Sequence, residues 1–212
     1  METIRQVFDF LGERPEQFTR LLEAHVRLSL TALVAALLLF VPVGIACAGS
    51  TRVGGTIVGA LSTIRVVPSL ALILLLYPWL GLGYVPAVVA LTMLAAPPLL
   101  QNTYAGMRQV EPAVLEAATG LGMNSRQRFL RVQLPLALPV IVAGARTAAV
   151  EIIASATLAS LVGVRTFGQW IVTGISLLDT TYLLAGALSV MLLVLAAEVL
   201  LGSLGYFISP KA

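Results

Sequence analysis

The stretch that decides the fold is residues 66–107, VVPSLALILLLYPWLGLGYVPAVVALTMLAAPPLLQNTYAGM, which holds 42 residues and no charged side chain. As a single helix it would be roughly 63 Å long, at a rise of 1.5 Å per residue. The hydrocarbon core of a bilayer is only about 30 Å thick. We therefore expect the stretch to contain two membrane crossings, joined by a turn at Gly81-Leu82-Gly83-Tyr84.

The composition of the whole chain is that of an integral membrane protein. Its 212 residues are 58% hydrophobic and 11% charged, and the mean hydropathy is +0.97. Soluble domains carry about 25% charged residues, and a globule of this size has too little interior to bury so much apolar surface. We predict an all-α integral membrane protein whose excess apolar surface faces lipid.

Five charge-poor stretches are long enough to cross a bilayer. The predicted spans are residues 28–48, 56–78, 85–105, 136–162 and 182–207. An odd number of spans places the two termini on opposite sides. Lysine and arginine are more numerous on the side that holds the loop 106–135 and the C-terminal tail 208–212. This bias favours an outside N-terminus and a cytoplasmic C-terminus.

The N-terminal tail, residues 1–27, mixes arginines with acidic residues. Its apolar residues Phe18, Leu21, Leu22 and Val26 recur at helical spacing. This pattern predicts an amphipathic helix on the membrane surface. A partly disordered tail is the alternative.

Rare residue types exclude several kinds of site. The only lysine is Lys211, so the chain has no lysine that could serve a phosphate-binding P-loop. His25 and Cys47 are single, which excludes a zinc site built from His and Cys and an intrachain disulfide. We interpret His25 as an interfacial or solvated side chain. The basic residues lie at span ends and in one loop, so we expect no nucleic-acid partner despite a pI near 9.4.

The loop 106–135 is the only long polar segment after the tail. Proline at a helix start and glycine at a helix end predict a short helix over 112–119. So short a helix is marginal alone in water and needs another surface to pack on. A second helix is predicted to start near Asn124 or Ser125 and to stop before Leu134-Pro135. The alternative is a solvated basic loop beside anionic lipid.

Fixed positions in this loop match a known signature. Glu116-Ala117-Ala118 is followed by three residues and Gly122, then by nine residues, Val132, one residue and Leu134-Pro135. This resembles the EAA signature of permease subunits of binding-protein-dependent ABC importers, with valine in place of isoleucine. The resemblance implies that the loop is cytoplasmic and forms a coupling helix that docks on an ATPase. The residues that it assigns to ATPase coupling are Glu116, Ala117, Ala118, Gly120, Gly122, Arg126, Leu134 and Pro135.

Three further segments, 67–72, 101–106 and 143–148, resemble the osmoprotectant branch of this family. Members of that branch import glycine betaine, choline, carnitine and related solutes, and methionine-importer permeases are the next nearest group. The resemblance implies a type I permease of five transmembrane helices, multi-pass in a bacterial or archaeal cytoplasmic membrane. It also implies that this chain is not an enzyme and binds no cofactor or metal. ATP and Mg belong to two partner ATPase subunits or domains. The other implied partners are a second permease subunit, identical or paralogous, and an extracytoplasmic solute-binding protein.

Glu151 lies near the middle of the predicted span 136–162, where an ionised carboxylate costs about 3 kcal/mol. It can line the translocation path and attract the ammonium group of a solute. It can instead pair with Arg146 or Arg65, or be held in its neutral form. The candidate path residues are Glu151, Arg65, Pro68 and Tyr104.

Intramembrane Glu151 and proline-broken spans also fit a protein of another class, a secondary transporter or channel that works without ATP. Aromatic residues make up 7% of the chain and do not gather at mid-depth in the predicted spans. An aromatic cage for a quaternary ammonium is therefore not expected here. Solute selectivity is expected to reside in the external binding protein.

Overall fold

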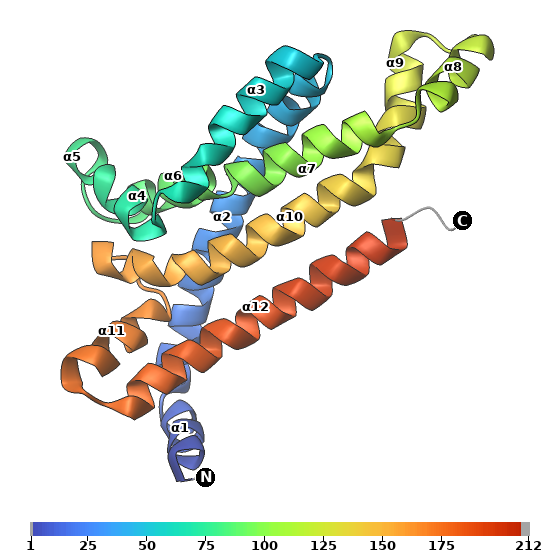
Figure 1. The fold of residues 1–212 in the computed structure, drawn as a ribbon. Coiled ribbons are helices and arrows are strands. Elements are labelled where there is room, and N and C mark those ends of the chain that lie inside the picture. The colour runs from blue at the N-terminus through green and yellow to red at the C-terminus, as the bar shows by residue number, and fades with distance from the viewer. Residues whose placement is uncertain (1, 209–212) are drawn as a thin grey trace.

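The computed structural model describes residues 2–208, and every regular element in that range is helical (Figure 1). The elements are α1 (Glu2–Glu13), α2 (Pro15–Ala48), α3 (Thr51–Ser62), η1 (Thr63–Val66), α4 (Ser69–Leu75), α5 (Tyr77–Leu80), α6 (Tyr84–Leu94), α7 (Ala96–Gln109), α8 (Pro112–Gly120), α9 (Ser125–Arg128), η2 (Phe129–Gln133), α10 (Leu134–Ala156), η3 (Thr157–Val162), α11 (Gly168–Leu177) and α12 (Thr180–Ile208). The all-α prediction is confirmed. Of the predicted C-terminal tail 208–212, all but Ile208 lies outside the described residues.

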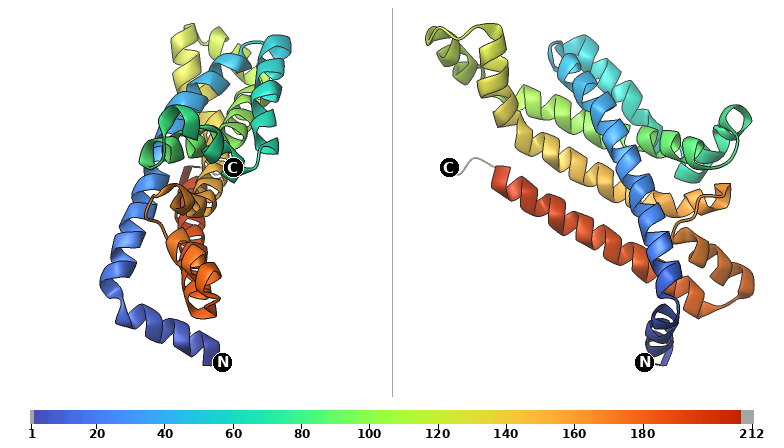
Figure 2. Two further views of the ribbon diagram at one scale, coloured as in Figure 1. Left: turned by 90° about the vertical axis from the view of Figure 1, so that its left-hand side faces the viewer. Right: turned by 180° about the vertical axis from the view of Figure 1, so that it is seen from behind.

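Four helices, α3, α7, α10 and α12, lie side by side as a layer, and α2 crosses behind them (Figures 1 and 2). In this arrangement α10 packs against α7 and α12, while α2 packs against α6, α7 and α10. The main core lies where these helices cross. It buries Leu28 and Ala32 of α2, Leu99 of α7, and Ala148 and Ile152 of α10. Small residues in α2 and α10 let the backbones approach closely, as is usual for packed helices in membranes.

Four helical stretches are long and apolar enough to cross a membrane. They are Pro15–Ala48, Tyr84–Gln109, Ser125–Val162 and Thr180–Ser203. A fifth crossing is present if the bent pair Arg52–Val66 and Ser69–Leu80 forms one span. The two halves of that pair meet at 96°, so the prediction of one continuous span over 56–78 is wrong. The bend falls at Pro68, because a proline disfavours the helical conformation in the residue before it, and Val67 is accordingly extended at φ −77° and ψ 122°.

The N-terminal region is helical, in α1 and in the first turns of α2, and part of its apolar face packs on other helices of the same chain. Val7, Phe10 and Leu21 are buried in one cluster with Phe167 and Trp170. The apolar face of the tail is therefore covered by α11 and α12 of the same chain. The sequence predicted that this apolar face contacts lipid, whereas in the structure buried residues of the face contact α11 and α12.

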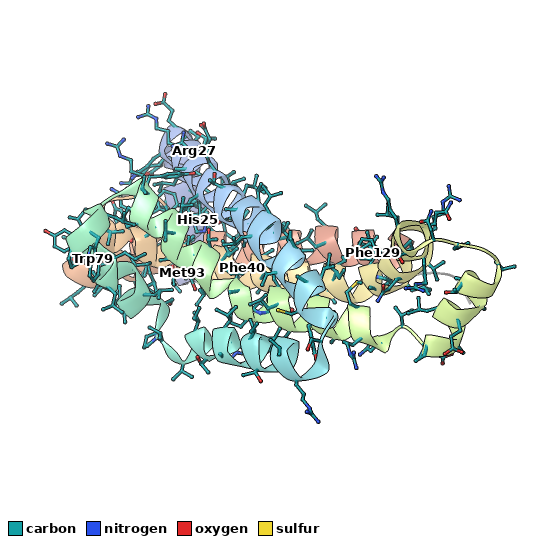
Figure 3. The ribbon with its side chains drawn as sticks, turned by 90° about the horizontal axis from the view of Figure 1, so that it is seen from above. His25, Arg27, Phe40, Trp79, Met93 and Phe129 are labelled. Carbon is teal, nitrogen blue, oxygen red and sulfur yellow. The ribbon has the colours of Figure 1, made fainter. Side chains whose placement is uncertain are left out.

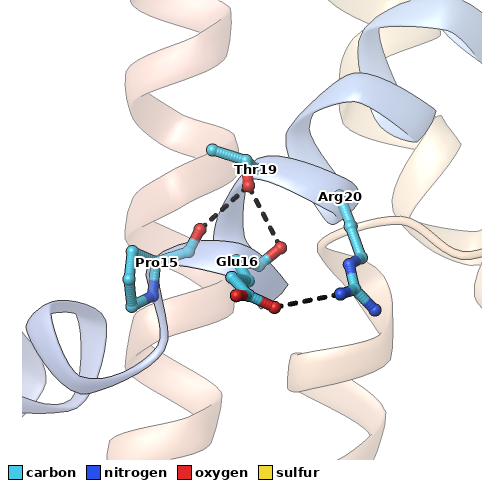
Figure 4. Close-up of polar contacts among 4 residues, drawn as sticks. All are labelled: Pro15, Glu16, Thr19 and Arg20. Atoms are coloured by element: carbon cyan, nitrogen blue, oxygen red, sulfur yellow. Dashed lines mark hydrogen bonds and ion pairs between the residues drawn. The ribbon is translucent and has the colours of Figure 1, made fainter.

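Local hydrogen bonds tie the first turn of α2 together (Figure 4). The Thr19 hydroxyl lies 3.0 Å from the Pro15 carbonyl oxygen and 3.1 Å from that of Glu16. Arg20 forms an ion pair with Glu16 at 3.0 Å, one helical turn away. Both side chains of this pair are exposed, so it adds only a few tenths of a kcal/mol to helix stability, about 0.3–0.5.

His25 is fully buried, and its interpretation as an interfacial or solvated residue is wrong (Figure 3). Its Nε2 donates a hydrogen bond of 3.0 Å to the carbonyl oxygen of Ile153 in α10. The ring lies beside that of Phe167, with the centroids 5.7 Å apart. The reason is that α2 begins at Pro15, so His25 lies inside the helix, where it crosses α10.

Candidate functional site

The hairpin of α8 and α9 stands apart from the rest of the molecule at one end of the helical layer (Figure 1). In α8 only Ala118 is buried and Leu115 half-buried, and the other side chains are exposed. This helix contacts mainly α9 and η2. A short helix with so little packing of its own presents most of its surface to a partner.

Local signals define both ends of α8. Pro112 occupies the first turn, where its missing N–H costs no hydrogen bond. At the other end the Gly122 N–H donates to the Thr119 carbonyl at 2.9 Å, and the Met123 N–H donates to the Ala118 carbonyl at 3.2 Å. These two bonds form a Schellman motif. The motif requires the left-handed backbone found at Gly122, φ +81°, which glycine adopts without strain. The prediction of a helix over 112–119 is confirmed to within one residue.

The start of α9 also follows from the sequence. Asn124 accepts a hydrogen bond of 2.9 Å from the Gln127 N–H, and the Asn124 N–H donates to the Gln127 side chain at 3.0 Å. This reciprocal capping box fixes the helix start, as predicted. Arg128 then donates a hydrogen bond of 2.9 Å to the Thr119 hydroxyl and joins α9 to α8.

The predicted stop before Leu134-Pro135 is wrong, because the helix continues into α10. Pro135 has no N–H that could donate a hydrogen bond to the preceding turn. The helix nevertheless continues through the π-helical turn η2. Leu134 packs with Met107 and Ala137, and the Gln133 side chain donates a hydrogen bond of 3.3 Å to the Met107 carbonyl. The base of the hairpin is thereby fixed to α7 and α10.

The structure gathers the eight predicted coupling residues in the hairpin and its base. Ala118 is buried and Leu134 half-buried, whereas the rest are exposed: Glu116, Ala117, Gly120, Gly122, Arg126 and Pro135. A cleft of about 350 Å³ lies at the base of α8, between the end of α7 and the start of α10. The hairpin thus offers one exposed acid on α8, one exposed base on α9 and a recess beside them.

At membrane depth, Glu151 is half-buried on α10 and forms no ion pair within 4 Å among the described residues. Arg146 pairs with Glu198 of α12, so the suggested pair of Arg146 with Glu151 is wrong. Five residues separate Arg146 from Glu151, which places them on different sides of the helix.

Polar side chains collect on the face of the layer that is turned away from α2. On α10, Thr147 is exposed one turn before Glu151, whereas Ala148 and Ile152 are buried against α2. On α7, Gln101 is exposed while its neighbour Leu100 is buried. Gln101 and Thr147 were not singled out from the sequence. The four-residue spacing of Thr147 and Glu151 was the available signal, but the sequence does not say which side of α10 is free.

The other predicted path residues are divided between two places. Pro68 lies at the 96° bend, three positions after Arg65. Tyr104 has its hydroxyl beside Gly55 of α3, ten residues before Arg65. That separation is about 15 Å along a helix. Arg65 and Pro68 therefore lie together at the bend, whereas Tyr104 lies nearer the end that carries α8.

Aromatic rings do gather, where α1, α11 and the first turns of α2 and α12 meet. Phe10 contacts Trp170 and Tyr182, with ring centroids 5.3 and 4.6 Å apart. The Arg14 guanidinium lies 4.1 Å from the Phe10 ring centroid. These rings pack on one another as a core cluster and leave no cage between them. Among the described residues, no group of three or more His, Cys, Asp or Glu side chains could hold a metal ion.

Comparison with known proteins places these features in a family. Residues 40–211 match the model of the binding-protein-dependent transport system inner membrane component. The carnitine transport permease protein OpuCB of Listeria monocytogenes is 39% identical over 89% of this chain and 86% of its own length. The choline transport system permease protein OpuBB of Bacillus subtilis is also 39% identical, over 84% of this chain and 82% of its own length. Among solved structures, an inward-facing MetNI methionine ABC transporter matches with a TM-score of 0.80 at 18% identity, covering 93% of this chain and 99% of that chain.

Proposed function

Because this chain belongs to the family of binding-protein-dependent transport system inner membrane components, it is a multi-pass permease subunit of an ABC importer in the cytoplasmic membrane, and we propose that its solute is a small osmoprotectant. ATP is hydrolysed on a separate ATPase subunit. The observation that carries the proposed solute class is 39% identity to carnitine and choline permeases over most of the chain. Glycine betaine, choline and carnitine share a quaternary ammonium group, so one class of solute covers all three.

In this proposal α8 is the coupling helix and docks on an ATPase subunit. The α8–α9 hairpin is then cytoplasmic, together with the end of α12, while α1 and α11 lie outside. The two described ends of the chain do lie at opposite ends of the molecule (Figure 1). A complete importer then needs two ATPase subunits or domains, a second permease and an extracytoplasmic solute-binding protein.

The polar face opposite α2 supplies half of the translocation path, and the second permease supplies the other half. It carries Gln101, Thr147 and Glu151 at membrane depth. Polar groups at this depth need protein or water beside them, because lipid cannot solvate them. Closure of the ATPases would tilt α8, and alternating access follows if solute binds the outward and inward states with different affinity.

Reconstitution of the permease with its partner subunits tests the proposed function. We expect ATP-dependent uptake of glycine betaine, choline or carnitine into proteoliposomes, with no uptake when ATP is replaced by a non-hydrolysable analogue. Uptake of methionine alone would show that the chain is a permease of an amino-acid importer. Uptake that is independent of ATP hydrolysis would show a secondary transporter or channel.

Replacing Glu151 with glutamine tests the role of this carboxylate in the path. We expect choline uptake to fall about tenfold, corresponding to roughly 1.4 kcal/mol of lost attraction for the cation. Glu23→Gln, which removes an exposed carboxylate near the start of α2, is the control and should transport normally. Wild-type choline uptake by Glu151→Gln would contradict the proposed attraction.

A further inference from the structure

A charged cleft of about 410 Å³ lies between the first turns of α2, the start of α6 and the loop that follows η3. Three arginines, Arg20, Arg27 and Arg165, line it together with one acid, Glu23, and the ring of Tyr84. Three guanidinium groups against one carboxylate leave an excess of positive charge. The cleft therefore attracts an anion.

Two of the three arginines are not neutralised by this chain. Arg20 forms its ion pair with Glu16. Arg27 and Arg165 have no carboxylate within 4 Å among the described residues. A guanidinium group can bind a phosphate through two parallel N–H···O hydrogen bonds. Arg27 and Arg165 are thus the groups of the cleft that are available to a phosphate.

The fold positions both of these arginines. Arg27 is exposed on α2 (Figure 3), with its guanidinium over the Tyr84 ring, 5.7 Å from the ring centroid. The Tyr84 hydroxyl donates a hydrogen bond of 3.3 Å to the Arg27 carbonyl oxygen. Arg165 is exposed between two buried residues, and the hydroxyl of the next residue, Thr166, donates a hydrogen bond of 3.1 Å to the Ala156 carbonyl oxygen. Donors that are held in place before a ligand arrives lose less entropy on binding.

The sequence of α2 sets the depth of the cleft in the membrane. Residues 28–48 carry no charge and are roughly 31 Å long as a helix, which matches a hydrocarbon core of about 30 Å. Arg27 directly precedes this stretch, and Tyr84 directly precedes the predicted span 85–105. Arg20 lies roughly 10 Å further along the helix. Because each headgroup region is about 5–8 Å thick, the cleft is at the level of the lipid headgroups.

The cleft continues into an apolar face of α2. Val34 and Leu38 follow Arg27 by seven and eleven residues, so both lie within about 20° of it around the helix. They are 52% and 74% exposed, whereas Leu28 and Ala32 are buried against the other helices. The second permease belongs to the polar face opposite α2 in the proposed function, and the present inference rests on that placement. The exposed face of α2 then meets lipid, with hydrocarbon at Val34 and headgroups at Arg27.

We propose that this cleft binds the headgroup of an anionic phospholipid, with Arg27 and Arg165 donating hydrogen bonds to its phosphate. The acyl chains of the same lipid lie along Val34 and Leu38. A soluble anion would not use this apolar continuation of the cleft. The excess positive charge also repels the ammonium group of a zwitterionic headgroup, so an anionic lipid binds more tightly.

Native mass spectrometry of the full importer complex, titrated in detergent with phosphatidylglycerol, tests the site. We expect Arg27→Gln and Arg165→Gln each to weaken binding of the first phosphatidylglycerol about tenfold. Arg5→Gln is the matched control, because Arg5 is also an exposed arginine near the N-terminus but does not line the cleft, and it should bind like the parent. Glu23→Gln should bind more tightly, since it removes the negative charge of the cleft.

Unchanged binding in either Arg27→Gln or Arg165→Gln would overturn the site, as would an equal loss with Arg5→Gln. Arg27→Lys separates the charge from the planar fork of the guanidinium. It should bind phosphatidylglycerol more tightly than Arg27→Gln and more weakly than the parent. All of these side chains are exposed, so the variants should melt at the temperature of the parent.

Two competitors identify the source of the phosphate. Phosphatidylcholine has the same phosphate without net charge, and inorganic phosphate has no acyl chain. We expect phosphatidylcholine to bind at least tenfold more weakly than phosphatidylglycerol, and excess inorganic phosphate to leave the bound lipid in place. Equal binding of phosphatidylcholine would overturn the anionic headgroup. Displacement by inorganic phosphate would show a site for a soluble anion instead.

The extracytoplasmic solute-binding protein is the alternative occupant. Its affinity for the reconstituted complex should be the same with Arg165→Gln as with the parent. A weaker affinity for the binding protein, together with unchanged binding of phosphatidylglycerol, would show that the cleft docks protein and would overturn the proposal. The lipid measurements use neither solute nor ATP, so a failure of this inference is distinguishable from a failure of the proposed transport function.

Discussion

Glu116→Arg is expected to abolish ATP-driven uptake while the permease still folds and inserts in the membrane. Glu116 is exposed on α8 and has no ion-pair partner among the described residues, so nothing in the fold depends on it. Its charge is exposed for the partner that we propose for α8. Reversing a charge in a docked interface places like charges together, which costs several kcal/mol. Because about 1.4 kcal/mol corresponds to a tenfold change in affinity, uptake should fall by at least a hundredfold.

The measurements are solute uptake, co-purification with the ATPase, and thermal stability of the purified permease. Glu111→Arg is the control, because Glu111 is also an exposed acid of the same loop but precedes the helix. It should retain uptake and ATPase binding. Normal uptake by Glu116→Arg would refute the coupling role of α8. A lower melting temperature of Glu116→Arg would show instead that the residue supports the fold.

Gly144→Val is expected to destroy the packing of α7 against α10. A Cβ atom at Gly144 would lie 2.6 Å from the Asn102 Cβ and 2.9 Å from the Pro98 carbonyl oxygen. The second of these is backbone and cannot move aside without shifting α7. Overpacking in a close-packed core costs about 1–3 kcal/mol, and more where backbone must move. We expect a melting temperature lower by several degrees and little folded protein after solubilisation.

Gly59→Val is the matched control for this substitution. Gly59 is also a helical glycine at membrane depth, in α3, but a Cβ there would meet no atom of this chain within 4 Å. Its melting temperature as an isolated permease should equal that of the wild type. If Gly144→Val and Gly59→Val melt alike, the tight contact between α7 and α10 is not a determinant of stability.

Local sequence signals were sufficient for both ends of α8 and for the start of α9. Pro112 sets the start of α8, Gly122 its end, and the capping box of Asn124 and Gln127 the start of α9. Each signal acts between residues a few positions apart, so no knowledge of the rest of the fold was needed. The break at Pro68 was missed, because the predicted span 56–78 runs through it, although the effect of the proline ring on the backbone of Val67 is also a local signal.

Contacts between distant segments were beyond the reach of the sequence. Arg146 faced several acids in the sequence, and only the packing of α12 against α10 selected Glu198, 52 residues away. The burial of His25 depends on Ile153, at a separation of 128 residues. The apolar face of the N-terminal helices could pack equally well on lipid or on protein. Its periodicity could not distinguish them.

The sequence by itself determined the medium, the helical class and the ends of α8 and the start of α9. These follow from hydrophobicity and from backbone preferences of neighbouring residues, which act within a few turns of a helix. Only the tertiary structure decided which side of α10 is free, and that Arg146 pairs with Glu198 while Glu151 forms no ion pair among the described residues. Those properties depend on how helices far apart in the chain are rotated and packed, because every side of an apolar helix is equally soluble in lipid until a neighbouring helix covers it.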